Sequence, residues 1–492
     1  MNGIIPATRH LLPVALITIL SAIGLSVSGQ RSGLQAFNDT IDLYPNIPVV
    51  YDILANDTIP AGDTVKSVAV YGIPGQPGVH IDVLRVHDTA WKWTFTFTLK
   101  TRGFAGEGWG RYFVRTAPFD TATGRILYRI HDRSFSYLDI NNVRARLHSD
   151  GNHFFYENAE FEVPKGSGKT SVFSNSLWIG GVDGLKNLHL AGYRYGQGPT
   201  TSTAHSKNDY FSGPLMNKPN YSVYHDTTWY RIWNLKRSDI DYHRQHFWQP
   251  GYTPVDDILQ WPGNGDTTLG QAWRLAPFSD RNGNGKYEPF DGDYPEIRGD
   301  QALFFIFNDE ANYHSETQGD PLRIEVHGLA YAFDLPEDSA LNNAIFLHYK
   351  IFNRSQNTYD STYLGVFTDI DLGYAADDYH RCDVERGMLI GYNGTPVDGM
   401  GQPNAYGENP PAQGVTILAG PYMDPDGIDN PRYGNTGEQL CDYSVNGANF
   451  GDTAIDNERF GMTRFMYFNN SSAGVPDYMT DPRYAAEYYK YL

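Results

Sequence analysis

Ten consecutive residues, 91–100, have the sequence WKWTFTFTLK and alternate strictly between apolar and polar side chains. A period of two places all apolar side chains on one face of a β-strand, whereas a helix would scatter them around its axis. Similar short runs recur along the chain, separated by turn-forming residues that include 50 glycines and 29 prolines. Helix-favouring runs of alanine, leucine, glutamate and lysine are few. The sequence therefore predicts a mainly β, multidomain protein.

The first 29 residues predict a signal peptide for export. Arg9 and His10 precede an apolar stretch over residues 11–27, and the small residues 26–28 suit a cleavage site. An uncleaved membrane anchor is the alternative, because the apolar stretch is close to the minimum length for crossing a bilayer. No later segment is apolar enough to cross as a helix. The mature protein is therefore expected to be secreted or displayed at the cell surface, without a transmembrane segment.

The charge balance narrows the range of partners. Acidic residues outnumber basic ones by 57 to 38, which gives a formal net charge of −19. Such a charge repels nucleic acid and attracts cations, so we exclude a nucleic-acid partner. The sequence GSGKT at residues 166–170 suggests a phosphate-binding loop, but the glycine needed five positions before Gly168 is Val163 and Pro164 follows it. We expect a surface turn there and no nucleotide.

The first folded unit is predicted at residues 41–137, after a polar spacer at 30–40. Its short strands, separated by turns, predict a β-sandwich. Residues 53–58, ILANDT, are followed by Pro60 and Gly62, and this stretch resembles the VLANDT signature of bacterial cadherin-like and immunoglobulin-like repeat domains. The resemblance implies that the unit is a spacer or adhesive module, not a catalytic domain.

The remainder is predicted to contain a loop-rich β region at residues 138–321 and a second β-sandwich or jelly roll at 322–492. Long strands are expected in LRIEVHGLAYAF, AIFLHYKIFNRS and STYLGVFTDIDL. In the second of these, alternation places one set of residues on a common face: Ile345, Leu347, Tyr349 and Ile351. Short helices are expected in RSDIDYHRQHF and in the C-terminal DPRYAAEYYKYL.

Several motifs after residue 138 together resemble large secreted proteins exported by the type IX secretion system: FEVPKGSGKTSVFSNSLWIGG, DRNGNGKYEPFDGDYP, FTDIDLG, DDYHRCD and IDNERFGM. The resemblance extends to the C-terminus and implies a surface or extracellular protein, without implying a particular chemistry. Proteins of this kind usually end in a sorting domain, and none is visible in this sequence. The chain is therefore expected to be C-terminally incomplete.

The stretch SDRNGNGKYEPFDGDYP carries oxygen-bearing side chains on alternate residues and predicts a structural calcium site. Calcium takes six to eight oxygen ligands, and a tight loop can direct alternate residues at one centre. Gly285 falls at the turn position of the EF-hand scheme and Tyr287 at its apolar position. The predicted ligands are Asp280, Asn282, Asn284, the Lys286 carbonyl, Glu288 and Asp291. No flanking helices are predicted, so an isolated loop in a β domain is expected. A polar Asn-Gly turn is the alternative.

Two other acidic groups are weaker calcium candidates. The first contains Asp369, Asp371, Asp377, Asp378 and Asp383, and the second contains Asp424, Asp426 and Asp429. Solvated acidic loops are the alternative for both groups. The only two cysteines, Cys382 and Cys441, allow either one disulfide or two free thiols.

No catalytic residues are predicted. His243 and His246 are three residues apart and lack the intervening glutamate of a zinc protease motif. The sequence favours an exported structural or adhesive protein with calcium-stabilised loops, whose partner is an extracellular glycan or protein surface. A secreted carbohydrate-active enzyme or carbohydrate-binding protein is the alternative, because a pair of carboxylates could serve glycoside hydrolysis and aromatic rings could stack on sugars. A dockerin-like module would need a paired loop-helix repeat, which the sequence lacks.

Overall fold

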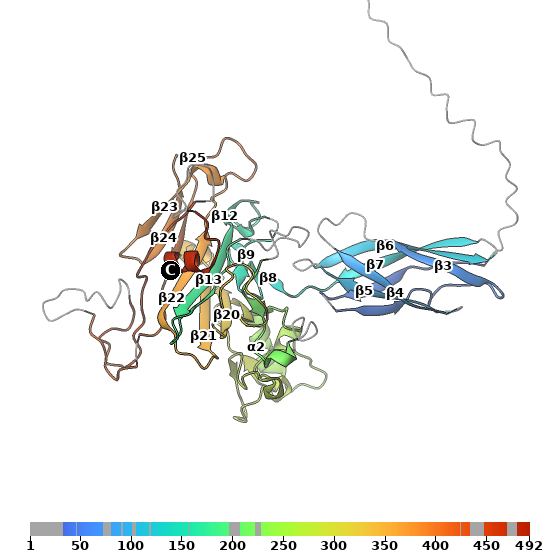
Figure 1. Ribbon diagram of the computed structural model, residues 1–492, viewed down its shortest axis with the longest axis horizontal. Coiled ribbons are helices and arrows are strands. Elements are labelled where there is room, and N and C mark those ends of the chain that lie inside the picture. The colour runs from blue at the N-terminus through green and yellow to red at the C-terminus, as the bar shows by residue number, and fades with distance from the viewer. Residues whose placement is uncertain are drawn as a thin grey trace, which may run out of the picture.

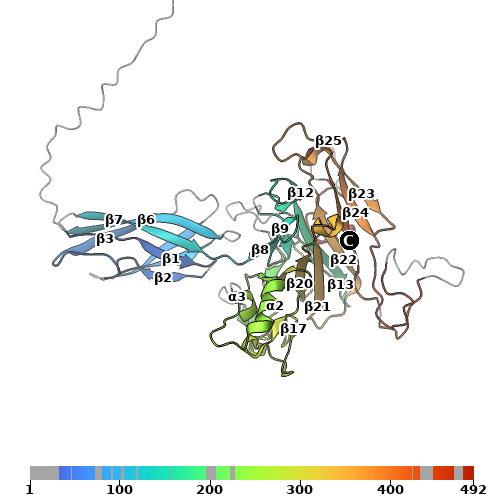
Figure 2. The ribbon, with the colours of Figure 1, turned by 180° about the vertical axis from the view of Figure 1, so that it is seen from behind.

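The computed structural model confirms a mainly β, multidomain protein (Figures 1 and 2). The predicted signal peptide and Cys441 lie outside the residues that it describes. No helix in the described part of the chain combines the length and the apolarity needed to cross a membrane. The described residues are 33–45, 47–71, 80–89, 92–100, 105–117, 120–156, 158–195, 207–221, 228–423, 425–432, 447–469 and 480–492.

An N-terminal β-sandwich consists of two sheets, with strand orders β1-β7-β6-β3 and β2-β5-β4. The strand β1 runs parallel to β7, and the other pairs are antiparallel. The strands are β1 (Asp39–Leu43), β2 (Val49–Asp52), β3 (Thr64–Tyr71), β4 (Ile81–Thr89), β5 (Lys92–Leu99), β6 (Gly106–Ala117) and β7 (Thr121–Ile130).

The alternating segment predicted to be a strand is β5. Its apolar residues are buried, with Phe97 exposing 0% and Leu99 1% of their surface. They contact the apolar residues of β6 and β7, including Tyr112 and Tyr128. All members of this hydrophobic cluster lie between residues 34 and 130, so the sandwich has a core of its own.

The sandwich lies to one side of the larger body, joined to it through the segment that leads into β8 (Figure 1). Arg133 in this segment donates a hydrogen bond to Asp256 at 2.6 Å. We predict that residues 33–136, expressed alone, fold cooperatively and show β-type circular dichroism. In this fragment Phe97→Ala should cost about 3–5 kcal/mol, because it empties a fully buried site. A fragment without a cooperative urea transition would contradict the prediction.

The larger body contains several sheets, of which three carry most of the core. Their strand orders are β15-β19-β20-β21 with β16 beside β19, β10-β13-β14 with β22 beside β13, and β12-β11-β9-β8. Smaller sheets are β23-β24-β27, β17-β18 and β25-β26. The first strands are β8 (Phe135–Leu138), β9 (Arg144–His148), β10 (Asn152–His153), β11 (Phe161–Glu162), β12 (Thr170–Val172), β13 (Ser174–Val182), β14 (Leu188–Ala191), β15 (Phe211–Ser212) and β16 (Trp233–Lys236). They are followed by β17 (Phe278–Ser279), β18 (Tyr294–Pro295), β19 (Gln301–Asn308), β20 (Ile324–Ala332), β21 (Phe346–Asn353), β22 (Asp360–Asp369), β23 (Asp378–Asp383), β24 (Met388–Asn393), β25 (Val397–Asp398), β26 (Gly407–Glu408) and β27 (Ala412–Thr416).

The sheets cross the division that the sequence predicts between residues 321 and 322. The strand β19 pairs with β20, and β13 pairs with β22, so each pair joins the two segments. One hydrophobic cluster also contains residues from both sides, including Phe305 and Val326. The change in sequence pattern reflects longer, more regular strands after residue 322. It does not mark a boundary between two domains in the structure.

The predicted helices are present as α2 (Arg237–His246) and α5 (Ala485–Tyr491), and two single turns are α3 (Asp256–Leu259) and α4 (Ser339–Asn342). Tyr488 of α5 is fully buried against Trp178 of β13. The strand predicted around Ile351 is β21, but Ile351 itself is partly exposed at 37%. Short 3-10 turns are η2 (Lys218–Asn220), η3 (Thr267–Leu269), η4 (Pro289–Asp291) and η5 (Ala375–Asp377).

Candidate functional site

The predicted calcium loop is the connection of a small hairpin. The strands β17 and β18 pair Phe278 with Pro295 and Ser279 with Tyr294, so the ends of the loop lie side by side. Asp293 is fully buried at this neck. Its carboxylate accepts hydrogen bonds from the backbone N–H groups of Arg281 at 2.8 Å and Glu288 at 2.9 Å. It therefore ties the start of the loop to its second half.

Asp280 lies at the centre of the first half of the loop. Its Oδ1 accepts hydrogen bonds from the N–H groups of Gly283 at 2.8 Å and Asn284 at 3.2 Å, and its Oδ2 from that of Gly285 at 2.7 Å. Gly283 and Gly285 have φ angles of +71° and +80°, which a residue with a Cβ atom adopts only with strain. The two glycines thus let the backbone wrap around one carboxylate, as the turn position of an EF-hand-type loop requires.

Asn282, Asn284 and Glu288 lie around the same centre. The Oδ1 atoms of the asparagines accept the N–H groups of Asn284 at 3.0 Å and Lys286 at 2.7 Å. The Nδ2 of Asn284 donates to Oε2 of Glu288 at 2.5 Å. The structure therefore brings four of the six predicted ligands together: Asp280, Asn282, Asn284 and Glu288.

The loop is held against the body by residues from other segments. Asn264 donates to the Gly285 carbonyl at 3.0 Å and accepts the Tyr287 N–H at 2.7 Å. The Tyr287 ring packs edge-on against Phe278, and its hydroxyl donates to the Ile258 carbonyl at 2.6 Å. The Nε2 of His243 donates to the Asp293 carbonyl at 3.0 Å, and burial lowers the pKa of this imidazole. His243 therefore has a structural role.

The remaining two predicted ligands are less closely joined. Asp291 is exposed on the turn η4, and Lys286 is exposed earlier in the loop. In the described residues, no three His, Cys, Asp or Glu side chains are arranged closely enough to hold a metal ion. The loop offers amide and backbone oxygens in addition to its carboxylates, as calcium sites commonly do.

The second candidate group lies where β22 ends and β23 begins. Burial, followed by the charges of Asp371 and Asp481, raises the pKa of Asp369 to about 7. Burial also raises the pKa of Asp378 to about 7, with further contributions from Asp371, Asp398 and Asp377. The structure therefore brings Asp369, Asp371 and Asp378 into one partly buried, negatively charged region.

Two further residues join this region, and sequence reasoning did not identify them. Asp398 is 1% exposed and accepts the N–H groups of Tyr374 and Tyr406. Asn393 is the strand partner of Asp378. One side-chain oxygen each of Asp377, Asp378 and Asn393 is buried and has no hydrogen-bond partner within the described ranges. The register of β23 with β24 places Asn393 opposite Asp378, and no local sequence motif predicts this pairing.

Other predicted residues lie apart from this region. Asp383 is at the opposite end of β23 from Asp378 and forms an ion pair with Arg386 at 2.7 Å, which lowers the pKa of Asp383. Asp426 accepts the Ile428 N–H at 2.8 Å, whereas Asp424 lies outside the described residues. Cys382 is partly buried on β23, and its predicted disulfide partner Cys441 is not among the described residues.

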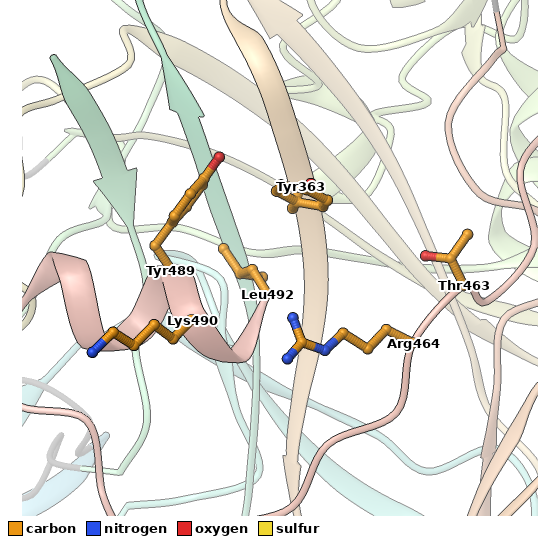
Figure 3. A pocket seen from close by; sticks show the side chains of 6 residues that line it. All are labelled: Tyr363, Thr463, Arg464, Tyr489, Lys490 and Leu492. Atoms are coloured by element: carbon orange, nitrogen blue, oxygen red, sulfur yellow. The ribbon is translucent and has the colours of Figure 1, made fainter. Parts of the chain in front are cut away.

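A pocket of 440 Å³ opens beside β22 and α5 (Figure 3). Tyr363 and Tyr489 face each other edge-on across 5.7 Å. Among the described residues, the lining contains two basic side chains and no acidic one: Tyr363, Thr463, Arg464, Tyr489, Lys490 and Leu492. It therefore lacks the carboxylate pair that glycoside hydrolysis requires.

A second pocket, of 270 Å³, lies beside the segment that joins the sandwich to the larger body. Asp256 and Asp257 contribute to its lining, but both form ion pairs with Arg231, at 2.9 and 2.8 Å. Their charges are thus compensated within the protein, as expected for a structural contact.

No family model and no curated protein sequence matches the chain.

Proposed function

We propose that the protein is an exported structural or adhesive component of the cell surface or extracellular space, with calcium-stabilised loops. The hairpin loop of residues 280–293 carries the proposal. It is folded around the Asp280 carboxylate, and Asn264 and Ile258 of a preceding segment hold it through hydrogen bonds with Gly285 and Tyr287. The net charge of −19 and a sandwich with its own core support the same function.

Calcium would act here as a structural ion. The carboxylate oxygens of Asp280 retain lone pairs beyond those used by the backbone N–H groups, and the same holds for the carbonyl oxygens of Asn282 and Asn284. Glu288 already lies within hydrogen-bond distance of Asn284. The ion would offset the negative charges of Asp280 and Glu288, with the Lys286 carbonyl and Asp291 as outer contributors. Binding would therefore stabilise the loop and perform no chemistry.

We further propose secretion by the type IX route and an extracellular glycan or protein surface as partner. The alternative, a carbohydrate-binding protein, is favoured by one feature, the pocket of Tyr363 and Tyr489. Its bases Arg464 and Lys490 would suit an anionic sugar, and its tyrosine rings would stack on it. Its lining offers no support for a glycosidase.

The test is the effect of calcium on the melting temperature of the whole protein. Calcium at about one hundred times Kd stabilises the folded state by about 2.7 kcal/mol, and extracellular modules often need about 0.1–1 mM calcium for half-saturation. Asp280→Ala should abolish the part of the increase that comes from this loop. Asp241→Ala, which removes a half-buried aspartate of the adjacent α2 whose ion pair with Arg244 is a surface contact, should respond like the wild type. An equal response of wild type and Asp280→Ala would show that the loop is only a turn.

A further inference from the structure

Two short segments after residue 426 have the same pattern. Residues 427–432 are GIDNPR and residues 454–459 are AIDNER, so Ile-Asp-Asn and an arginine two residues later recur in both. The isoleucines Ile428 and Ile455 are both exposed, at 56% and 61%. The two copies therefore share an environment as well as a sequence.

The aspartate of each copy holds the backbone that leads into the other copy. Asp429 accepts the N–H groups of Gly451 at 2.8 Å and Thr453 at 2.7 Å. Asp456 in turn accepts the N–H group of Gly427 at 2.8 Å. These reciprocal hydrogen bonds close the two copies into one unit.

The asparagine of each copy is oriented by an acid of its own segment. The Nδ2 of Asn457 donates to Asp452 at 3.1 Å, and the Nδ2 of Asn430 faces Asp426 at 3.5 Å. With the amide nitrogens so directed, the carbonyl oxygens of both asparagines are buried and have no hydrogen-bond partner among the described residues. Asn430 as a whole is only 8% exposed.

A buried carboxylate follows Asn457 directly in the chain and accepts a hydrogen bond from the Asn430 backbone. Glu458 is 1% exposed; its Oε1 accepts the Asn430 N–H, while its Oε2 is buried without a partner in the part of the chain that the structure describes. Leaving a charged oxygen without a partner inside a protein is costly, and native proteins provide a counter-charge, water or an ion. None of the ion pairs among the described residues involves Glu458.

The two arginines of the repeat do not supply this counter-charge. The guanidinium of Arg432 donates to the Gly447 carbonyl. That of Arg459 donates to the Gly420 carbonyl at 3.2 Å and lies 3.7 Å from the centre of the Tyr422 ring. Both therefore stabilise the backbone around the unit, and neither pairs with the Glu458 carboxylate.

We propose that this paired repeat binds one calcium ion through Glu458 Oε2 and the carbonyl oxygens of Asn430 and Asn457. The exposed acids Asp426 and Asp452 lie at its rim and attract the cation. The inner ligands are all oxygens, which suits a hard cation, and a carboxylate with two amide carbonyls resembles calcium coordination. This site is separate from the hairpin loop of residues 280–293 and does not depend on it.

The test is the number of calcium ions bound by the full chain, measured by equilibrium dialysis with elemental analysis. Glu458→Gln should lower the number by one, and Asp280→Ala should lower it by one independently. Glu316→Gln, which alters another buried glutamate that is paired with Arg194, is the matched control and should leave the number unchanged. Asn457→Ala should weaken calcium binding at the repeat at least about tenfold, and it leaves the Glu458 carboxylate in place.

Hydrogen exchange measured by mass spectrometry assigns the result to a segment. Calcium should slow exchange in peptides covering residues 425–432 and 450–459, both in the wild type and in Asp280→Ala, but not in Glu458→Gln. If calcium leaves exchange in these peptides unchanged in the wild type, water fills the site and the inference is overturned. The same holds if Glu458→Gln binds as many ions as the wild type. If calcium slows exchange at the repeat but leaves exchange at residues 280–293 unchanged in the wild type, the calcium site proposed for the hairpin is overturned and the inference for the repeat is kept.

Discussion

Asp293→Ala is expected to lower the free energy of unfolding of the larger body by about 3–5 kcal/mol, the largest loss that we expect from any residue of the hairpin loop. The Asp293 carboxylate is fully buried and accepts the N–H groups of Arg281 and Glu288. Each hydrogen bond to a charged group contributes about 1.5–3 kcal/mol, and alanine leaves both donors without a partner. Because these bonds shape the loop, the calcium response of the hairpin should disappear as well.

Urea unfolding of the whole protein, with and without calcium, measures both effects. Asp291→Ala is the matched control for the stability without calcium, since it removes an exposed aspartate only two residues away. It should change the stability without calcium by less than about 0.5 kcal/mol, as surface substitutions usually do. If Asp293→Ala unfolds at the same urea concentration as Asp291→Ala, the neck of the hairpin does not depend on the buried carboxylate.

The contrast between Asp291 and Asp293 shows what the sequence could predict of this site. Spacing alone identified Asp280, Asn282, Asn284 and Glu288, because alternate residues of a tight loop converge locally. The same spacing selected Asp291, which the turn η4 leaves exposed. The importance of Asp293 arises from the pairing of β17 with β18, which decides which acid is buried at the neck.

Longer-range features were less predictable. Alternation in residues 91–100 predicted β5, because a strand's own sequence records which face is buried. No sequence pattern predicts that β13 pairs with β22. This pairing places Ser174 opposite Asp369, although the two residues are far apart in the sequence. The neighbourhood of Asp378, Asn393 and Asp398 depends on such pairings. For the same reason, the boundary predicted after residue 321 divides segments that share sheets.

Asp39→Asn is expected to stabilise the N-terminal sandwich by about 1–3 kcal/mol at pH 7.5 and to have little effect at pH 4. Asp39 is 2% exposed, and one of its oxygens is buried without a hydrogen-bond partner. The pKa of Asp39 is raised to about 6, chiefly by burial; the hydrogen bond from Tyr51 opposes this rise, and the charge of Asp57 adds to it. Ionising Asp39 in the folded sandwich is therefore unfavourable.

The direction of the pH effect follows from the protons bound in each state. Below pH 4 Asp39 is protonated in both states, and it contributes no difference. Between about pH 4 and pH 6 the unfolded chain has released this proton while the folded sandwich keeps it, so stability falls as the pH rises. Above about pH 6 both states are ionised and the loss is constant. Asparagine cannot ionise, so the variant avoids this loss. The pKa of Asp39 is about two units higher in the folded sandwich than in the unfolded chain, which limits the loss of stability to about 3 kcal/mol.

The measurement is urea unfolding of residues 33–136 at several pH values between 4 and 8. Asp42→Asn on the same strand is the control, because Asp42 is exposed and its ion pair with His131 is a surface contact. Surface pairs contribute about 0–1 kcal/mol, so this variant should be equal to the wild type or slightly less stable. The difference between Asp39→Asn and wild type should therefore grow from pH 4 to pH 6 and then remain constant. A difference that is the same at every pH would mean that Asp39 ionises as freely in the sandwich as in the unfolded chain, and that its burial carries no electrostatic cost.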